Sequence, residues 1–241
     1  SLAWNRVLHL SAAGRDSADV SLTYGDAWRR VDEIPLSPER LTVLKAALTC
    51  LRQGEGWRAW GEGGLARGLA WFGAPGDRPG LPAAAPHVRF TKVEGHAGLI
   101  VAPAGLPLGY TGQMDVQYSP VGLYGPEQFR LGGMTSVRGF DETIAAGDRG
   151  TQFRHELSLR TSQSDADGGT AMPFVFIDHG AARLVSATAT RLAGAGFGVR
   201  LAARLAARPW SADLVLARPI DHNVPLAHPG WHLHATLRID L

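Results

Sequence analysis

One arginine stands in a setting that favours binding a single carboxylate. Arg138 lies between an apolar residue and a glycine, with an aromatic residue directly after the glycine. The residues of this motif are Gly132, Gly133, Val137, Arg138, Gly139 and Phe140. Its glycines indicate a backbone that turns tightly or passes close to another surface. Because a planar guanidinium can grip a carboxylate with two parallel hydrogen bonds, the motif predicts a loop tip that delivers one guanidinium to one carboxylate.

A second motif lies further along the chain, in the run Phe176-Ile-Asp178-His-Gly180. Side chains alternate between the two faces of a strand, so Phe176, Asp178 and Gly180 share one face. Asp178 can therefore point inward from a barrel wall while Val175 and Ile177 point outward. Each motif alone is short enough to recur by chance, but the two together in this order form a specific pattern.

The two motifs resemble the Val-Arg-Gly-Tyr/Phe and Phe-x-Asp-x-Gly signatures of the TpsB transporters. This is the haemolysin secretion/activation protein family of two-partner secretion, which belongs to the BamA-type superfamily of outer-membrane barrels. The resemblance implies that the loop carrying Arg138 folds into the barrel lumen and that Arg138 meets Asp178 on the inner wall. It also implies that Phe140 packs the loop tip against that wall. The alternative is that Arg138 and Asp178 are two unrelated surface charges.

Other candidate sites are weaker. His232 and His234 form a His-x-His on one strand face, but no Cys, His or Asp cluster nearby in the sequence completes a tetrahedral metal site. Asp178 and His179 are neighbours on a strand and point to opposite faces, which argues against a catalytic dyad. The sequence contains no Gly-x-Ser-x-Gly elbow, Walker loop or His-Glu-x-x-His. We therefore expect no enzymatic activity, no metal and no cofactor.

Composition excludes some function classes. The 24 Lys and Arg against 22 Asp and Glu give a formal charge of +2, which is too balanced to indicate a nucleic-acid partner. Cys50 is the only cysteine, so the chain cannot form an internal disulfide. No run approaches about 18 consecutive apolar residues, which argues against helical membrane spans. The mean hydropathy of −0.05 is compatible with transmembrane strands, because their alternating residues cancel.

Alternation of apolar and polar residues is clearest at the end of the chain. From Trp231 to Leu241 the odd positions are apolar and the even positions are polar or charged. This run has the length of a membrane-spanning strand of about 9–11 residues. We expect the strand at 231–241 to carry the signal for the barrel assembly machinery, although outer-membrane proteins usually end in Phe and this chain ends in Leu.

The same reading along the chain predicts an all-β fold, a transmembrane antiparallel β-barrel with a long inward-folded loop. The expected strands are 2–10, 18–28, 40–52, 57–72, 87–101, 107–120, 152–161, 172–181, 194–208, 211–220 and 230–241. Short turns alternate with longer connections, as in outer-membrane barrels. The longest connection, 121–150, shows no helix or strand period and should be functional. Two expected strands after it, 152–161 and 194–208, carry arginines at Arg154, Arg160, Arg200, Arg204 and Arg208, which indicate a polar lumen wall or a surface that guides an unfolded polypeptide.

The family resemblance implies how this chain fits into a larger protein. TpsB barrels have sixteen strands with the signature loop between the eleventh and twelfth, so residues 1–241 would be the C-terminal part of the barrel, holding about 11 strands. The first strands and the periplasmic POTRA domains would be absent. The implied function is export of a large exoprotein of the haemagglutinin/haemolysin type across the outer membrane of a Gram-negative bacterium, by type V secretion, in contact with membrane lipid. The alternatives are a BamA-type insertase and a passive porin-like barrel.

Overall fold

A single large sheet dominates the structure, which is a computed structural model describing residues 1–27, 30–31, 34–35, 39–160, 169–205 and 208–239. Within these residues the sheet has eleven antiparallel strands. In order across the sheet they are β1 (Leu2–Ser11), β2 (Gly14–Ala27), β5 (Glu39–Gly54), β6 (Trp57–Leu69), β7 (Thr91–Val101), β8 (Leu108–Tyr118), β11 (Arg149–Leu159), β12 (Thr170–Arg183), β13 (Thr190–Leu205), β14 (Arg208–His222) and β15 (His232–Ile239).

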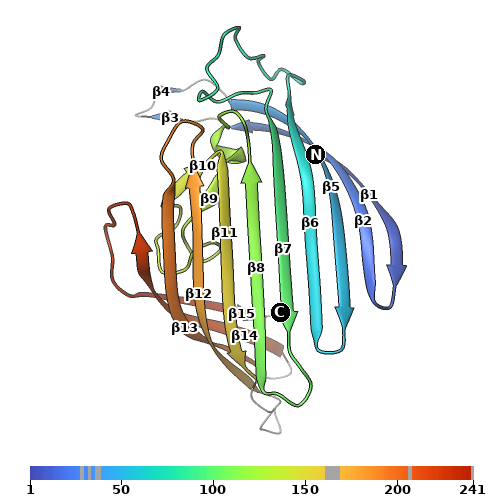
Figure 1. Cartoon of the computed structure of the whole chain (residues 1–241), viewed down its shortest axis with the longest axis vertical. Coiled ribbons are helices and arrows are strands. Elements are labelled where there is room, and N and C mark those ends of the chain that lie inside the picture. The colour runs from blue at the N-terminus through green and yellow to red at the C-terminus, as the bar shows by residue number, and fades with distance from the viewer. Residues whose placement is uncertain (28–29, 32–33, 36–38, 161–168, 206–207, 240–241) are drawn as a thin grey trace.

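Each strand of this sheet pairs with the sheet strand that follows it in the sequence, so the whole sheet is one meander. The sheet curls like part of a barrel wall, with β14 and β15 behind the nearer strands (Figure 1). Six of its described strands precede the longest connection and five follow it. The predicted all-β antiparallel barrel wall is confirmed, and the expected strand positions agree with the structure to within a few residues.

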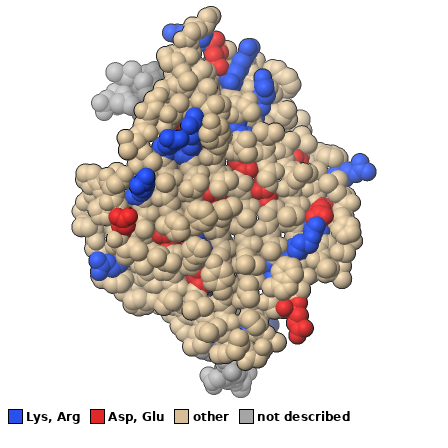
Figure 2. Space-filling view, viewed as in Figure 1, with Lys and Arg blue, Asp and Glu red and all other residues tan. Residues whose placement is uncertain are grey.

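Exposure of apolar side chains follows the predicted alternation. On β12, Val175 and Ile177 are 55% and 46% exposed, whereas Phe176 and Asp178 are 6% and 0% exposed. Large apolar residues therefore cover one face of the sheet, and we call the opposite face, on which residues 119–148 pack, the inner face. In Figure 2 most of the middle of the molecule is uncharged, and Lys and Arg project mainly near the upper loops and at the sides.

The connections differ at the two ends of the strands (Figure 1). Tight turns link β1 to β2 and β5 to β6, while residues 70–90 and 119–148 form long connections at the other end. The turn expected at 165–169 lies almost entirely outside the described residues. Among the described residues, no helix is long and apolar enough to cross a membrane.

The long connection, residues 119–148, is called the inner loop from here on. Contrary to prediction, it contains regular structure: a 3-10 turn, η1 (Gly125–Glu127), and two paired strands, β9 (Phe129–Leu131) and β10 (Ala145–Gly147). Strands of three residues are too short for a period of two to show in the sequence. The β9–β10 hairpin contacts β11 and β12 (Figure 1) and shapes the loop into a compact body.

Two arginines of the predicted inner rows lie elsewhere. Arg208 begins β14 and does not extend β13, and because its neighbour Pro209 pairs with Arg204, Arg208 falls on the opposite face from Arg204. Arg160 follows the end of β11 and donates hydrogen bonds to the carbonyl oxygens of Pro103 and Leu106 in the β7–β8 turn. Both corrections arise because the strand ends before the arginine is reached, β13 at Leu205 and β11 at Leu159.

Candidate functional site

Arg138 and Asp178 are in direct contact between the inner loop and the wall. Arg138 Nε donates to Asp178 Oδ2 at 2.6 Å, and its Nη2 donates to Oδ1 at 2.9 Å. The backbone N–H of Arg138 also donates to Oδ2 at 3.1 Å. The two residues are 3% and 0% exposed, so a two-pronged ion pair with a third hydrogen bond is held away from water.

A second carboxylate, Glu156 of β11, extends this contact to a neighbouring strand. It accepts a hydrogen bond from Arg138 Nη1 at 3.1 Å and two from Arg200 of β13, at 2.5 and 2.9 Å. Glu156 is 8% exposed. We call Arg138, Asp178, Glu156 and Arg200 the tip clamp, since they join the loop tip to β11, β12 and β13 in one network.

Two aromatic rings form the floor of the tip clamp. The Arg138 guanidinium carbon lies 3.6 Å from the ring centroid of Phe176, and that of Arg200 lies 4.4 Å from the ring centroid of Phe174. A cation over an aromatic face gains electrostatic attraction, and more so when desolvated. Phe176 is thus both a neighbour of Asp178 in the motif and a contact of Arg138.

Arg154 adds a further positive charge beside the clamp. Its Nε lies 3.8 Å from Asp178 Oδ2, and this nitrogen is buried without a hydrogen-bond partner. Three guanidinium groups, on Arg138, Arg154 and Arg200, thus surround the two carboxylates. The three guanidinium groups outnumber the two carboxylates, so removing any one of these arginines would change the local charge balance.

Glycines allow the loop to lie directly on the wall. Gly132, Gly133 and Gly139 have φ values of +110°, +86° and +95°, a region that L-residues with a side chain rarely adopt. A Cβ at Gly139 would lie 2.6 Å from the backbone of Arg218, and one at Gly180 would lie 2.6 Å from Leu131 Cδ1. Every glycine of the two sequence motifs therefore serves a turn or a close approach.

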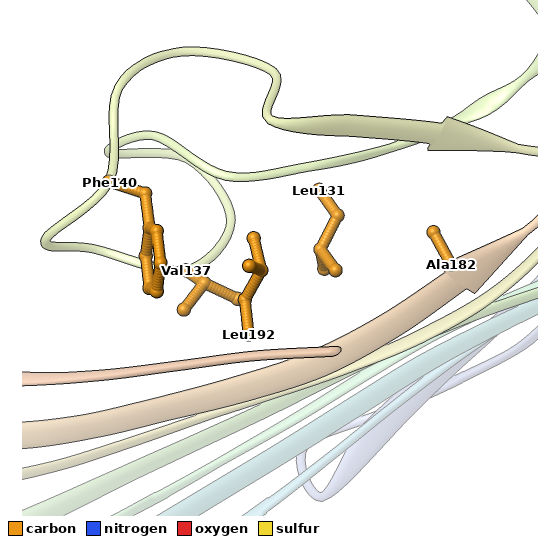
Figure 3. Close-up of a cluster of buried hydrophobic side chains, with 5 residues drawn as sticks. All are labelled: Leu131, Val137, Phe140, Ala182 and Leu192. Atoms are coloured by element: carbon orange, nitrogen blue, oxygen red, sulfur yellow. The ribbon is translucent and has the colours of Figure 1, made fainter. Parts of the chain in front are cut away.

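Apolar side chains fill the space around the tip (Figure 3). Leu131, Val137 and Phe140 of the inner loop pack with Ala182 of β12 and Leu192 of β13, and all five are at most 2% exposed. Burying side chains of this kind contributes roughly 1.5–3 kcal/mol each for the larger ones. The loop tip is thus held by an apolar cluster as well as by charge.

A chain of hydrogen bonds leads from the loop to the far part of the wall. The Ser136 hydroxyl donates to Gln152 Oε1 at 2.5 Å, and Gln152 Nε2 donates to Asp115 Oδ2 at 2.6 Å. Asp115 is also bonded to His96, which accepts from Trp60 at 3.3 Å. The loop is therefore coupled to β6, β7 and β8 in addition to the strands of the clamp.

Comparison with known proteins identifies the family. A family model described as haemolysin secretion/activation protein ShlB/FhaC/HecB matches residues 1–201. The chain belongs to this family. "Outer membrane transporter CdiB" of Dickeya dadantii (strain 3937) is 32% identical over 168 residues, which cover 68% of this chain and 28% of that protein. "Outer membrane transporter CdiB-2" of Burkholderia pseudomallei (strain 1026b) is 27% identical over 224 residues, covering 90% and 37%.

Solved structures agree with this assignment to the haemolysin secretion/activation family. CdiB from Escherichia coli superposes with a TM-score of 0.85 at 25% identity, covering 98% of this chain and 44% of that one. CdiB from Acinetobacter baumannii superposes with a TM-score of 0.74 at 17% identity, covering 98% and 40%, and shows the fold alone. The chain spans less than half the length of these relatives, and it forms part of a β-barrel of the Gram-negative outer membrane.

Sequence reasoning missed several residues of the site. Glu156 is one of several polar residues that alternate with apolar ones on β11, and nothing in the sequence marks it as the second carboxylate for Arg138. Gly194 was also missed: a Cβ there would lie 1.9 Å from the Arg138 carbonyl oxygen. The alternating glycines Gly194, Gly196 and Gly198 of β13 are the signal that could have revealed a flat inner surface.

The His-x-His pair lies on β15, and Asp178 and His179 point to opposite faces of β12. His232 Nε2 bonds to the His228 carbonyl oxygen at 3.0 Å, and its Nδ1 lies 3.7 Å from Asp141 in the inner loop. Among the described residues, no group of three or more His, Cys, Asp or Glu could hold a metal ion. Asp178 is buried on the inner face, whereas His179 is exposed on the other face.

Proposed function

We propose that the intact protein exports a large partner polypeptide across the outer membrane, with the inner loop as a plug that shifts during transport. The partner is an exoprotein of the haemagglutinin/haemolysin type, and export uses neither ATP nor catalysis. The described strands would be the last eleven of sixteen, and the domains that bind the partner would precede them. Family membership supports export, and the pairing of strands in one meander supports the strand assignment.

The tip clamp is the observation that carries this proposal. A buried Arg138 bound to two carboxylates holds a loop of about thirty residues against the inner wall, where a passive pore would need open space. A clamp made of ion pairs can exist in a bound and a released arrangement without covalent change. A plug of this kind suits a channel that must stay closed until a polypeptide enters.

The outer face of the sheet is proposed to contact membrane lipid. Val175 and Ile177 on β12, Leu157 on β11 and Phe197 on β13 are all more than 40% exposed. The last strand, β15, continues this pattern with Leu233 at 73% exposed, and it lies at the sheet edge, where the assembly machinery could recognise the 231–241 segment. Apolar surface of this extent would be unfavourable in water.

Replacing Ile177 by arginine should therefore destabilise the barrel in lipid. The expected cost is about 2–4 kcal/mol if the residue lies near the middle of the bilayer. The measurement is the midpoint of urea unfolding of the full-length protein in lipid vesicles. Ala202→Arg is the matched control, because Ala202 shares the inner face of β13 with Arg200 and Arg204 and should accept a charge with little effect. Equal destabilisation by the two variants would contradict a lipid-facing outer surface.

Deletion of the gene, followed by complementation, tests the proposed export directly. Deletion should remove one large exoprotein from the culture medium, and the full-length gene should restore it. Other outer-membrane proteins should keep their normal levels. A general loss of outer-membrane proteins with no specific secretion defect would instead indicate an insertase, and an unchanged medium would refute export.

A further inference from the structure

The chain contains only two lysines, Lys45 and Lys92, and both lie on the inner face next to Glu94. Lys45 Nζ lies 2.6 Å from one oxygen of Glu94, and Lys92 Nζ lies 3.2 Å from the other. Lys45 also pairs with Glu62 at 2.7 Å. These contacts form a charged row across β5, β6 and β7, on a part of the wall separate from the tip clamp.

Lys92 differs from Lys45 because it also holds the inner loop. Its Nζ lies 3.0 Å from the carboxylate of Glu127, in η1, and donates to the Glu127 carbonyl oxygen at 3.2 Å and to Gln117 Oε1 at 3.3 Å. Gln117 Nε2 donates to the same carbonyl oxygen at 2.9 Å. The Lys92 side chain is 8% exposed. The Lys92 ammonium can donate three hydrogen bonds to acceptors that surround it, whereas a guanidinium donates only within its own plane.

The two ends of the inner loop are tied together near this contact. Asp148, which is 0% exposed, accepts a hydrogen bond from the backbone N–H of Leu123 at 2.7 Å and another from Val185 at 2.9 Å. Its own N–H donates to the Arg183 carbonyl oxygen at 2.9 Å. Asp148, at the end of the loop, therefore binds Leu123 near its start. Asp148 also binds Arg183 and Val185, where β12 leads into the β12–β13 connection.

We propose that Lys92 is a positioning residue that anchors the base of the inner loop while the tip is released. The Lys92–Glu127 contact joins η1 to β7, and Gln117 extends it to β8, whereas the tip clamp lies on β11, β12 and β13. The base of the inner loop then stays bound to the wall, while the segment 128–147, which includes the tip, moves as one hinged unit. This deepens the proposed function, because the plug would swing aside within the barrel and return after export.

Hydrogen–deuterium exchange of the full-length protein in lipid vesicles tests the hinge without any cargo. Separate peptides report the base, residues 119–128, and the tip, residues 132–142, whose Arg138 N–H is bonded to Asp178. Arg138→Ala should speed exchange of the tip by about tenfold or more and leave the base protected. Lys92→Gln should speed exchange of the base. Two results would overturn the proposal: faster exchange of both the base and the tip in Arg138→Ala, or unchanged exchange of the base in Lys92→Gln.

Two further variants separate the anchor from a general effect on the wall. Lys45→Gln alters the same Glu94 but does not touch Glu127, so it should leave both peptides unchanged. The double variant Lys92→Gln/Glu127→Gln should exchange no faster at the base than Lys92→Gln alone, since both changes act on one contact. Additive increases, or an equal effect of Lys45→Gln, would refute the anchor. Secretion is assayed separately, so normal export by Arg138→Ala with the expected exchange pattern would count against the proposed function only.

Discussion

Arg138→Ala in the full-length protein should reduce secretion of the partner exoprotein by at least about tenfold. Removing one member of a buried ion pair costs about 3–5 kcal/mol, because the remaining charge stays buried. Asp178, which is 0% exposed, would lose both guanidinium hydrogen bonds and keep only the backbone N–H of residue 138 at 3.1 Å and the distant contact with Arg154 at 3.8 Å. At about 1.4 kcal/mol for each factor of ten, the equilibrium constant for docking of the loop would fall by about two to four orders of magnitude. Immunoblots of the culture medium measure secretion, and single-channel recordings in planar bilayers measure loop closure.

Substitution of Asp178, the ion-pair partner of Arg138, provides the second half of this test. Asp178→Ala should also reduce secretion, and the double variant should be no worse than the more severe single variant, because both act on one contact. Arg204→Ala is the control, since Arg204 is an exposed arginine on β13, the strand that carries Arg200. Additive defects, or normal secretion and conductance in either single variant, would show that Arg138 and Asp178 do not act as a latch.

Gly194→Ala should displace the loop tip while leaving every charge of the clamp in place. A Cβ at Gly194 would lie 1.9 Å from the Arg138 carbonyl oxygen, which is a backbone atom that cannot rotate away. The loop must therefore move off β13 or the strand must shift. We expect a secretion defect comparable to that of Arg138→Ala, together with altered conductance, in a barrel that still assembles. Heat-modifiable migration in gels checks assembly, and the same secretion and bilayer assays measure the defect.

Gly63→Ala on β6 is the matched control, because a Cβ there would meet no atom within 4 Å. It should leave secretion and conductance unchanged. The combination of Gly194→Ala with Arg138→Ala should resemble either variant alone, since both release the same tip. Normal conductance in Gly194→Ala would mean that the loop does not need to rest on β13.

Strand positions were largely predictable from the sequence because each strand faces two different environments. Apolar and polar residues alternate from Trp231 to Leu241, and on β12 the exposed Val175 and Ile177 alternate with the buried Phe176 and Asp178. Errors arose where a new strand began before the alternation had ended, as at Arg208, and where strands were only three residues long, as in the β9–β10 pair. Period-two patterns need several residues before they can be distinguished from chance.

The two motifs contain several glycines, one arginine and one aspartate. From the sequence alone they indicated Arg138 and Asp178 as the central residues of the candidate site. They could not determine that Glu156 would be shared by Arg138 and Arg200, or that Gly194 would lie beneath the Arg138 carbonyl oxygen. Those contacts depend on the register between β11, β12 and β13 and on the path of the loop across them. Sequence alternation assigns a side chain to a face of the sheet, because it is a local property of one strand. Which side chains meet on that face was decided by strand register and loop packing, because these join residues far apart in the chain.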